Sequence, residues 1–408
     1  MSFAAGPANA GLIALLTDDV DVEGKRVLVR EDLNVPLEGG RVADGTRIRA
    51  AAPTLLDLSE RGARVIVMTH VGRPAGRVVE SLRTAQLAPE LARALGRSVK
   101  TCDDCIGPVA QAAVAALQDG DVLLLENLRF HPQEEADDDG FAQALAQLGD
   151  IYVDDAFGTA HRAHASTAGI ARHLPSYMGP LMATELEILD GVLHRPRRPF
   201  VAVLGGAKVA DKIGVIDRLL KLCDHVVVGG GMANTLLAAQ GVEVGKSLRD
   251  PDLGPAKNIL AEAEEREGRA RLHLPVDAVV SKSVSDEAGA REVKISDVAS
   301  DDMILDIGID TAKHFRGVIL EAEMVLWNGP MGVFERDAFG AGTEAVGQAI
   351  VDSGAYSVVG GGDSGAAAVK FGFAGKLTHV STGGGATLEY IEGKDLPGVA
   401  ALRKAGPA

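Results

Sequence analysis

The stretch RVLVREDLN, residues 26–34, is a short apolar run that ends in charged and polar side chains. The same pattern returns further along the chain, and helix-like segments separate its copies. The copies are ARVIVMTH at 63–70, DVLLLENL at 121–128 and IYVDDAF at 151–157, and the helix-like segments are 47–60 and 82–95. Runs of Val, Ile and Leu that alternate with amphipathic segments are typical of buried parallel strands connected by helices. The first half of the chain is therefore predicted to be an α/β domain built on a parallel sheet.

A proline-rich segment divides this pattern in two. Residues 181–194 read as one amphipathic helix, and RPRRP at 195–199 ends it because proline cannot continue a helix. The apolar runs then start again, with a helix expected at 210–223. These runs are FVAVLGG at 200–206, HVVVGGG at 225–231, MVLWNGP at 324–330, YSVVGGG at 356–362 and LTHVSTGGG at 377–385. We expect an α/β fold of two doubly wound, Rossmann-like parallel-sheet domains joined by a hinge helix, with an interdomain cleft.

Length and composition agree with two such domains. A chain of 408 residues exceeds what one hydrophobic core usually serves. The formal net charge of −16 gives no global reason to bind nucleic acid or anionic lipid. No apolar stretch approaches the roughly 18 residues that a membrane span needs. We expect a cytoplasmic protein with no nucleic-acid or membrane partner, and with domains at 1–180 and 199–392, a helix and linker at 181–198, and a tail at 393–408.

Two glycine motifs suggest other nucleotide-binding folds. Gly360, Gly362 and Gly365 fit the dinucleotide pattern GxGxxG after an apolar run, but few residues follow them, and Asp363 would repel a pyrophosphate unless a cation intervened. We interpret this segment as a metal–nucleotide loop. The segment GVEVGKS at 241–247 is similar to a P-loop, but its glycines are one residue too close and it follows a helix-like stretch. We expect a surface turn there.

Three further motifs involve cysteine, acidic residues and histidine. Cys102 and Cys105 form a CxxC pair, but no second pair completes a four-ligand zinc site, so we expect two ordinary core residues and leave a redox role open. The acidic tract 134–139 is typical of a solvated face. His161 and His164 lack nearby further ligands and have an arginine between them, which disfavours a metal site.

Basic and polar side chains follow several of the predicted strands in the first half. They are Arg30, Asp32, Asn34, His70, Arg73, Arg129, His161 and Arg162. In an open α/β sheet, ligands bind beyond the carboxyl ends of the strands. Clustered arginines repel one another unless an anion or a carboxylate neutralises them. A phosphate-bearing carboxylate would suit this edge of the sheet.

Glycines take the corresponding places in the second half. They lie at 205–206, 229–231, 329, 360–362 and 383–385. Bare backbone amides at the starts of helices bind phosphates. Lys208 and Lys212 are four residues apart, so on a helix they share a face and can reach one phosphate chain. Asp363 is the natural partner of Mg²⁺.

The basic set comes without an obvious catalytic carboxylate. Kinases that phosphorylate hydroxyl groups need a residue that positions or deprotonates the nucleophile. An acceptor carboxylate has a pKa of roughly 4 and is already ionised at neutral pH. The enzyme then needs only to overcome the repulsion between two anions and to stabilise the phosphoryl group in transfer. The residues suggest phosphoryl transfer between a nucleotide and a small anionic carboxylate.

Nine collinear motifs, spread over nearly the whole chain, resemble those of phosphoglycerate kinase. They are VLVREDLNVP, THVGRP, LLENLRFHPQEE, DAFGTAHRAH, LGGAKVADKI, GGGMA, WNGPMGVFE, GGGDS and STGGGATLE. The resemblance implies reversible, Mg²⁺-dependent phosphoryl transfer between 1,3-bisphosphoglycerate and ADP, which gives 3-phosphoglycerate and ATP in glycolysis and gluconeogenesis. It also implies in-line transfer without a general base, closure of the two domains of a monomer, and a tail that packs on the first domain.

The resemblance assigns the site residues as well. On the first domain, 3-phosphoglycerate would be held by Asp32, Leu33, Asn34, Arg47, His70, Val71, Gly72, Arg73, Arg129 and Arg162. On the second domain, Mg-ATP or Mg-ADP would be held by Gly206, Ala207, Lys208, Lys212, Gly230, Asn328, Glu335, Gly361, Gly362, Asp363 and Ser364, with Asp363 as the Mg²⁺ ligand. The residues expected to act on the transferring phosphoryl group are Arg47, Lys208, Lys212 and Gly385.

The chain departs from the usual family sequence at several places, and these bear on nucleotide preference and hinge details. Asparagine is usual at Asp154, threonine at Ser364, proline at Ile309, and a lysine-containing stretch at 183–185. Two rival functions can be weighed against this one, and the second is disfavoured because Arg47, Lys212 and Asp363 are all present. An oxidoreductase that used the Gly360 motif would bind NAD tightly, and a catalytically silent homologue would be expected to lack the charged site residues.

Overall fold

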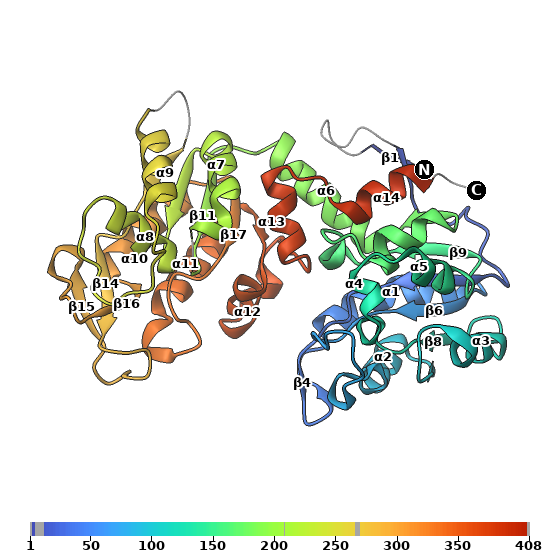
Figure 1. Ribbon diagram of the computed structural model, residues 1–408. Helices are drawn as coiled ribbons and strands as arrows, with labels where there is room; N and C mark the ends of the chain where they lie inside the picture. Colours follow the sequence, from blue (N-terminus) through green and yellow to red (C-terminus); the bar gives the residue numbers. More distant parts are fainter. Residues whose placement is uncertain (1, 5–11, 208, 266–269, 406–408) are drawn as a thin grey trace. The chain divides into compact units, whose positions relative to one another are not determined.

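The computed structural model describes residues 2–4, 12–207, 209–265 and 270–405. The chain divides into two compact units, Met1–Asp190 with Gly393–Ala408, and Gly191–Glu392. The division falls inside α6 (Pro180–His194), so this helix contributes residues to both units. Each unit contains one six-stranded parallel sheet (Figure 1).

The sheet of the first unit has the strand order β10-β9-β3-β6-β8-β7. Its strands are β3 (Arg26–Arg30), β6 (Arg64–Met68), β7 (Val99–Thr101), β8 (Val122–Leu124), β9 (Ile151–Asp154) and β10 (Ser176–Met178). From β3 the chain winds outward through β6 to β7, returns to β8, and then crosses to β9 on the other side of β3. The strand order therefore reverses between β3 and β9, which is where open α/β sheets bind ligands.

Helices cover this sheet and close its core. They are α1 (Thr46–Glu60), α2 (Ala88–Leu95), α3 (Gly107–Ala115), α4 (Pro132–Glu135) and α5 (Asp139–Ala146), with short helices η3 (Leu128–Phe130), η4 (Phe157–Thr159), η5 (Ala165–Gly169) and η6 (Ile170–Arg172). Val27 and Val29 of β3 pack with Ile48 and Leu55 of α1, all of them fully buried. The helix predicted at 47–60 is confirmed. Two small hairpins complete the unit, β1 (Ser2–Ala4) with β2 (Leu12–Ala14) and β4 (Leu37–Glu38) with β5 (Arg41–Val42).

The helix predicted at 82–95 is wrong in its first half. Instead of one helix, the chain forms the short turns η1 (Glu80–Leu82) and η2 (Thr84–Gln86) before α2. The carboxylate of Glu126, which lies 42 residues further along the chain, accepts the backbone N–H of Thr84 at 2.8 Å. It also accepts the Thr84 hydroxyl at 3.1 Å. This contact fixes the backbone outside a helix, and hydrophobic periodicity does not reveal it.

The sheet of the second unit has the order β13-β12-β11-β17-β18-β19. Its strands are β11 (Phe200–Leu204), β12 (His225–Val228), β13 (Arg271–His273), β17 (Met324–Asn328), β18 (Tyr356–Val359) and β19 (His379–Val380). In chain order this is the 3-2-1-4-5-6 arrangement of dinucleotide-binding sheets, with its switch point between β11 and β17. Two parallel sheets flanked by helices confirm the predicted α/β class.

Seven helices accompany this second sheet among the described residues. They are α7 (Ile213–Leu222), α8 (Gly230–Ala239), α9 (Gly254–Glu265), α10 (Ile309–Leu320), α11 (Ala341–Ser353), α12 (Gly362–Lys370) and α13 (Gly385–Glu392). The helix predicted at 210–223 begins as the short turn η7 (Ala210–Lys212). The buried carboxylate of Asp250 accepts the N–H groups of Val209 and Ala210 at 2.8 and 2.9 Å, which ties this turn to a loop 40 residues away.

A small antiparallel sheet, which the sequence pattern did not predict, also belongs to the second unit. Its order is β15 (Arg291–Lys294), β14 (Asp277–Ser281), β16 (Met303–Ile307), and it lies at the margin of the unit (Figure 1). Ala278 and Val280 of β14 form a separate apolar cluster with Leu237 of α8 and Val244. The segment 241–247 follows α8 without forming a helix or strand, but it is not the surface turn that was predicted, because Val244 and Ser247 within it are buried.

The C-terminal helix α14 (Pro397–Ala405) belongs to the first unit, although it is the last element of the chain (Figure 1). It contacts β2, β10 and η5. The N–H of Gly398 donates to the carbonyl of Ala160 at 2.9 Å, and a Cβ on Gly398 would lie 3.1 Å from the Ala160 Cα. A glycine at this position lets the two backbones approach closely.

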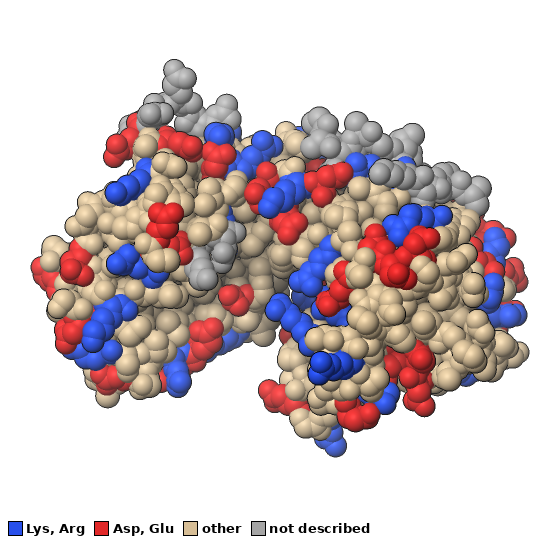
Figure 2. All heavy atoms as spheres, in the orientation of Figure 1, with Lys and Arg blue, Asp and Glu red and all other residues tan. Residues whose placement is uncertain are grey.

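The charged surface is mixed. Lys and Arg side chains alternate with Asp and Glu side chains over the visible face of each unit (Figure 2). A helix with the length and apolar character that a bilayer crossing requires is absent from the described ranges.

Three histidines form a hydrogen-bonded row on the second unit. His225 Nδ1 lies 3.0 Å from His273 Nε2, and His273 Nδ1 lies 3.0 Å from His314 Nε2. Burial lowers the pKa of His273 to about 4, and the charges of His225, His314 and Arg271 act in the same direction. Burial also lowers the pKa of His225.

We predict that His273→Asn makes stability less sensitive to acid. The folded-state pKa of His273 lies below its ordinary value of 6.5, so the unfolded chain takes up the proton more readily. The contribution of His273 to stability is complete above pH 6.5 and is lost as the pH falls to about 4. Urea unfolding across this pH range should therefore show that the free energy of unfolding falls less in the variant than in the parent. His379→Asn, which lies outside the row, should keep the pH dependence of stability that the parent has. If the free energy of unfolding of His273→Asn and the parent falls equally with pH, this account is contradicted.

Candidate functional site

An ion pair joins two of the predicted site residues at the end of β3. Asp32 follows β3, and Arg47 lies in the first turn of α1. Arg47 Nη1 donates to Asp32 Oδ2 at 2.5 Å, and the Asp32 side chain is only 10% exposed. Asp32 therefore orients the guanidinium of Arg47 at the carboxyl edge of the sheet.

The loop after β6 is held from two sides by predicted site residues. Asn34 Oδ1 accepts the N–H of Gly72 at 2.8 Å, and Arg129 Nη1 donates to the Gly72 carbonyl at 3.1 Å. Gly72 has a φ of +63°, and a Cβ there would lie 2.9 Å from a methyl group of Leu82. Only glycine fits this turn without strain. The structure thus brings Asn34, Gly72 and Arg129 together.

His70 lies at the centre of a positively charged surrounding and is itself buried. Its pKa is held well below its ordinary value, first by burial and then by the charges of Arg30, Arg129, Arg47 and Arg162. The imidazole is therefore neutral at pH 7. Arg30 Nη2 lies 3.2 Å from His70 Nδ1, and a guanidinium can only donate, so Nδ1 is the acceptor. The ring proton is then on Nε2, which leaves His70 a hydrogen-bond donor to offer.

Arg129 is a buried cation that is incompletely neutralised by the protein. Burial lowers its pKa to about 10, the charge of Arg30 acts in the same direction, and Glu135 opposes them. Arg129 Nε lies 3.3 Å from Glu135 Oε1, without hydrogen-bond geometry. A bound anion could accept a charge-assisted hydrogen bond from Arg129 Nε, which has no hydrogen-bond partner within the described ranges.

Glu134 corrects the prediction that the acidic tract 134–139 is a solvated face. Its carboxylate is fully buried and accepts the Ser166 N–H at 2.9 Å and the Ser166 hydroxyl at 2.5 Å. Ser166 Oγ in turn accepts from Arg30 Nε at 2.9 Å. A chain of contacts thus leads from Glu134 through Ser166 and Arg30 to His70. Ser166 lies 32 residues from Glu134, so no local sequence signal identifies this support.

Further buried carboxylates lie behind the site. Asp154 is fully buried, and Asp154 Oδ1 accepts the Ala156 N–H at 3.1 Å. Burial is the main cause that raises its pKa to about 7, and the charge of Arg30 opposes that rise. The pKa of Glu31 is raised well above its ordinary value, by burial first and then by the charges of Asp155 and Asp154. Neither carboxyl oxygen of Glu31 has a hydrogen-bond partner within the described ranges.

The predicted site residues of the first unit differ in how far their side chains are exposed. Leu33 and Val71 are buried in the core. The backbone N–H of Leu33 is bonded to the Thr69 hydroxyl at 3.0 Å. Arg73 is exposed, and Arg162 is half-buried and donates through Nε to its neighbour His161. The charged and amide side chains, rather than Leu33 and Val71, therefore carry the polar character of this edge.

In the second unit, Lys212 and Asn328 connect the ends of three strands. Lys212 Nζ donates to the Gly205 carbonyl at 2.8 Å, after β11, and to Asn328 Oδ1 at 2.9 Å, at the end of β17. Asn328 Nδ2 donates to the Gly360 carbonyl at 2.6 Å, after β18. Lys208, predicted to act with Lys212, lies outside the described residues.

Glycines allow the loops after β11 and β17 to touch. A Cβ on Gly205 would lie 2.0 Å from the carbonyl oxygen of Pro330, and a Cβ on Gly329 would lie 2.2 Å from the carbonyl oxygen of Gly205. The Gly329 N–H donates to Ser364 Oγ at 2.6 Å. No side chain fits between these two loops, so the edge at the switch point is bare backbone.

Helix starts supply donors at the same edge. α8, α12 and α13 begin at Gly230, Gly362 and Gly385. The first N–H groups of a helix lack intrahelical partners, and the helix dipole favours an anion there. Asp363, in the first turn of α12, is exposed, as are Ala207 and Glu335. The edge combines amide donors, the ammonium of Lys212 and one carboxylate.

The sequence profile of the phosphoglycerate kinase family matches residues 17–394. The chain belongs to the phosphoglycerate kinase family. It is therefore a kinase of glycolysis, and the resemblance of the nine motifs is confirmed. The oxidoreductase alternative for the Gly360 motif was wrong.

Curated members of the phosphoglycerate kinase family cover nearly the whole chain. The phosphoglycerate kinase of Pelotomaculum thermopropionicum is 53% identical over 94% of this chain and 98% of its own. That of Moorella thermoacetica is 54% identical over 95% of this chain and 98% of its own. Their similarity supports the same family assignment for both halves of the chain.

Solved structures of phosphoglycerate kinases have the same fold. The Coxiella burnetii structure has a TM-score of 0.82 and 40% identity, and covers 94% of this chain and 97% of its own. The Pyrococcus horikoshii structure has a TM-score of 0.85 and 35% identity, over 96% and 99% of the two chains.

We predict that Asp154→Asn alters the pH dependence of stability. The folded-state pKa of Asp154 is raised from 3.8 to about 7. Its contribution to stability is therefore complete below pH 3.8 and is lost as the pH rises through about 7. Asparagine does not ionise, so the free energy of unfolding of the variant should fall less than that of the parent between pH 5 and pH 8, measured by urea unfolding.

Asp57→Asn is a matched control, because Asp57 is an exposed carboxylate of α1 paired with Arg61. It should keep the pH dependence of the parent. If Asp154→Asn and the parent lose the same stability over this range, Asp154 is not the buried titrating group inferred here.

Proposed function

We propose that this protein catalyses reversible phosphoryl transfer between 1,3-bisphosphoglycerate and ADP, giving 3-phosphoglycerate and ATP. The observation that carries the proposal is the contrast between the two sheet edges. One edge has guanidinium groups around the neutral, buried His70. The other has bare glycine loops and helix starts around Lys212. The first suits a small carboxylate that carries phosphate, and the second suits a nucleotide phosphate chain.

On the first unit, we assign 3-phosphoglycerate to the edge at β3 and β6. Arg129, Arg162 and Arg73 supply charge for the phosphate end, and His70 donates through Nε2. Asp32 accepts from Arg47, so Arg47 is positioned near the reacting carboxylate rather than free to rotate. Arg47 then stabilises the charge of the transferring phosphoryl group.

On the second unit, we assign the nucleotide phosphates to the starts of α8, α12 and α13. In this assignment Lys208 and Lys212 neutralise these phosphates, and Gly385 offers a backbone amide to the transferring group. We assign Asn328 and Glu335 to the nucleoside. Their neighbours in this assignment are Gly206, Ala207, Gly230, Gly361, Gly362 and Ser364.

The residues at α12 fit a magnesium ion. Mg²⁺ prefers oxygen ligands and commonly binds through one or two carboxylates together with substrate phosphates. Asp363 is an exposed carboxylate in the first turn of a helix whose start is also a phosphate site. When bound, Mg²⁺ would neutralise phosphate charge. The carboxylate of Asp363 would hold it, and the adjacent helix start would orient the phosphates.

No general base is required for this reaction. The acceptor carboxylate of 3-phosphoglycerate is ionised at neutral pH, with a pKa of roughly 4. Catalysis then consists of placing two anions in line and stabilising the charge between them. We propose that the domains 1–180 and 199–392 close around the substrates through the hinge 181–198, in a cytoplasmic monomer whose tail 393–408 stays with the first domain.

The reaction can be tested by trapping its labile product. The purified chain, Mg-ATP and 3-phosphoglycerate should form an acyl phosphate, which hydroxylamine converts into a stable hydroxamate. We expect hydroxamate above a blank without enzyme, and none when Mg²⁺ or 3-phosphoglycerate is omitted. Folded protein that binds ATP yet forms no hydroxamate would contradict the proposed function.

We predict that Arg47→Ala and Lys212→Ala each lower turnover by at least roughly a hundredfold, as for loss of a donor that stabilises transition-state charge. The rate can be followed as ADP release from Mg-ATP and 3-phosphoglycerate. Arg49→Ala is the matched control for Arg47, since Arg49 is an exposed arginine of the same helix. It should keep near-parental turnover, whereas near-parental turnover of Arg47→Ala or Lys212→Ala would refute the assigned role.

A further inference from the structure

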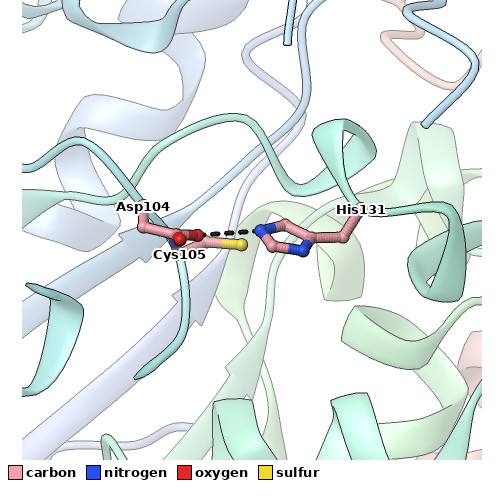
Figure 3. Close-up of side chains that lie close together, drawn as sticks. All are labelled: Asp104, Cys105 and His131. Carbon is pink, nitrogen blue, oxygen red and sulfur yellow. Dashed lines mark hydrogen bonds and ion pairs between the residues drawn. The ribbon is translucent and has the colours of Figure 1, made fainter. Parts of the chain in front are cut away.

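The CxxC segment acquires a partner that its sequence does not show. Cys105 lies in the loop after β7, and His131 follows η3, 26 residues later in the chain. Figure 3 shows the His131 ring pointing toward the Asp104 carboxylate and the Cys105 sulfur. Cys102 and Cys105 were predicted to be ordinary core residues because the sequence has no second cysteine pair. The fold supplies a histidine and an aspartate instead.

The three side chains converge closely. His131 Nε2 lies 2.8 Å from Asp104 Oδ1, and one ligand atom from each of the three residues lies within 4.8 Å of the others. The backbone N–H of Cys105 donates to Asp104 Oδ1 at 2.7 Å, which fixes the carboxylate relative to the thiol. The ring of His131 packs against that of Phe141, with centroids 5.3 Å apart. In the described part of the chain, this is the one such cluster, and it does not include His161 or His164.

The ligand types select a class of cation. A thiolate, an imidazole and a carboxylate together suit Zn²⁺, whereas Mg²⁺ and Ca²⁺ prefer oxygen ligands alone. A thiolate and a carboxylate also bring two negative charges, which balance a divalent cation. We propose that Asp104, Cys105 and His131 form a Zn²⁺-binding site on the first unit, separate from the magnesium–nucleotide site.

Two of the three proposed ligands are partly exposed to solvent. The side chains of Asp104 and His131 are 39% and 28% exposed, while Cys105 is buried. Three protein ligands leave one position of a tetrahedral Zn²⁺ for water. The thiol of Cys102 donates to the Asp104 carbonyl at 3.1 Å, so it supports the same turn without being one of the three ligands.

Occupancy would tie the Cys105 loop to the segment that positions Arg129. His131 is the N-cap residue of α4 and directly follows η3, the turn that contains Arg129. The first turn of α4 contains Glu135, which lies beside Arg129, and Glu134, which supports Ser166. A cation held between His131 and the Cys105 loop would therefore restrain the turn that carries Arg129.

Metal binding by the whole, tag-free chain tests this site without any activity assay. The protein is stripped with a chelator in a non-chelating reductant and titrated with Co²⁺, and bound Co²⁺ is then displaced with Zn²⁺. We expect one ion per chain and a thiolate-to-cobalt charge-transfer band. Cys105→Ser should abolish that band. His131→Gln and Asp104→Asn should each lower the affinity for Zn²⁺ by more than about a hundredfold. Loss of a residue that only supports a metal ligand already costs about 10- to 100-fold in affinity.

Two matched controls separate the site from general effects of substitution. His173→Gln removes another histidine of the first unit. His173 Nε2 also lies 3.0 Å from an aspartate oxygen, that of Asp139, but it is not part of the proposed site. Cys223→Ser removes a buried thiol of the second unit. Both should bind one ion as the parent does. The proposal is overturned if the parent binds no Co²⁺ or Zn²⁺, or if the partly exposed His131 can be replaced in folded protein without loss of affinity.

Discussion

The first unit depends on the buried guanidinium of Arg30, whose hydrogen bonds within the described residues go to uncharged groups. Arg30 ends β3, is fully buried, and contacts the Ser166 hydroxyl, the Glu31 carbonyl and His70. Its charge is one reason why His70 stays neutral and why Arg129 has a lowered pKa. Buried charges are costly unless they are paired. The buried carboxylates near this edge therefore compensate part of its positive charge. The positive charge that remains is available to an anionic ligand.

The second unit offers its anion site mainly through backbone groups rather than through arginine side chains. The glycines at 205 and 329 bring two loops into direct contact, and Lys212 and Asn328 connect the ends of three strands. Helix starts then supply donors that have no intrahelical partners. The same parallel architecture thus produces two edges of different chemistry, because one sequence places arginines after its strands and the other places glycines.

Sequence patterns predicted the parallel sheets, helix α1 and the residues that cluster at the strand ends, because strand ends follow directly from the apolar runs. They failed where a distant side chain decides local structure. Glu126 fixes the backbone at Thr84 and shortens the predicted helix at 82–95. Glu134 is buried and accepts a hydrogen bond from Ser166, although the acidic composition of its tract predicts a solvated face. His131 joins the cysteine loop only through the fold. Each case is a tertiary contact between residues far apart in the chain, which period and composition do not encode.

Calorimetric titration of 3-phosphoglycerate, without nucleotide or Mg²⁺, tests most directly whether the arginine edge of the first unit is an anion site. The account predicts binding to the parent that weakens as salt is added. It also predicts at least about tenfold weaker binding to folded Arg129→Gln, since a hydrogen bond to a charged group contributes roughly 1.5–3 kcal/mol. Equal affinity of the parent and Arg129→Gln, or binding that requires the nucleotide, would contradict it.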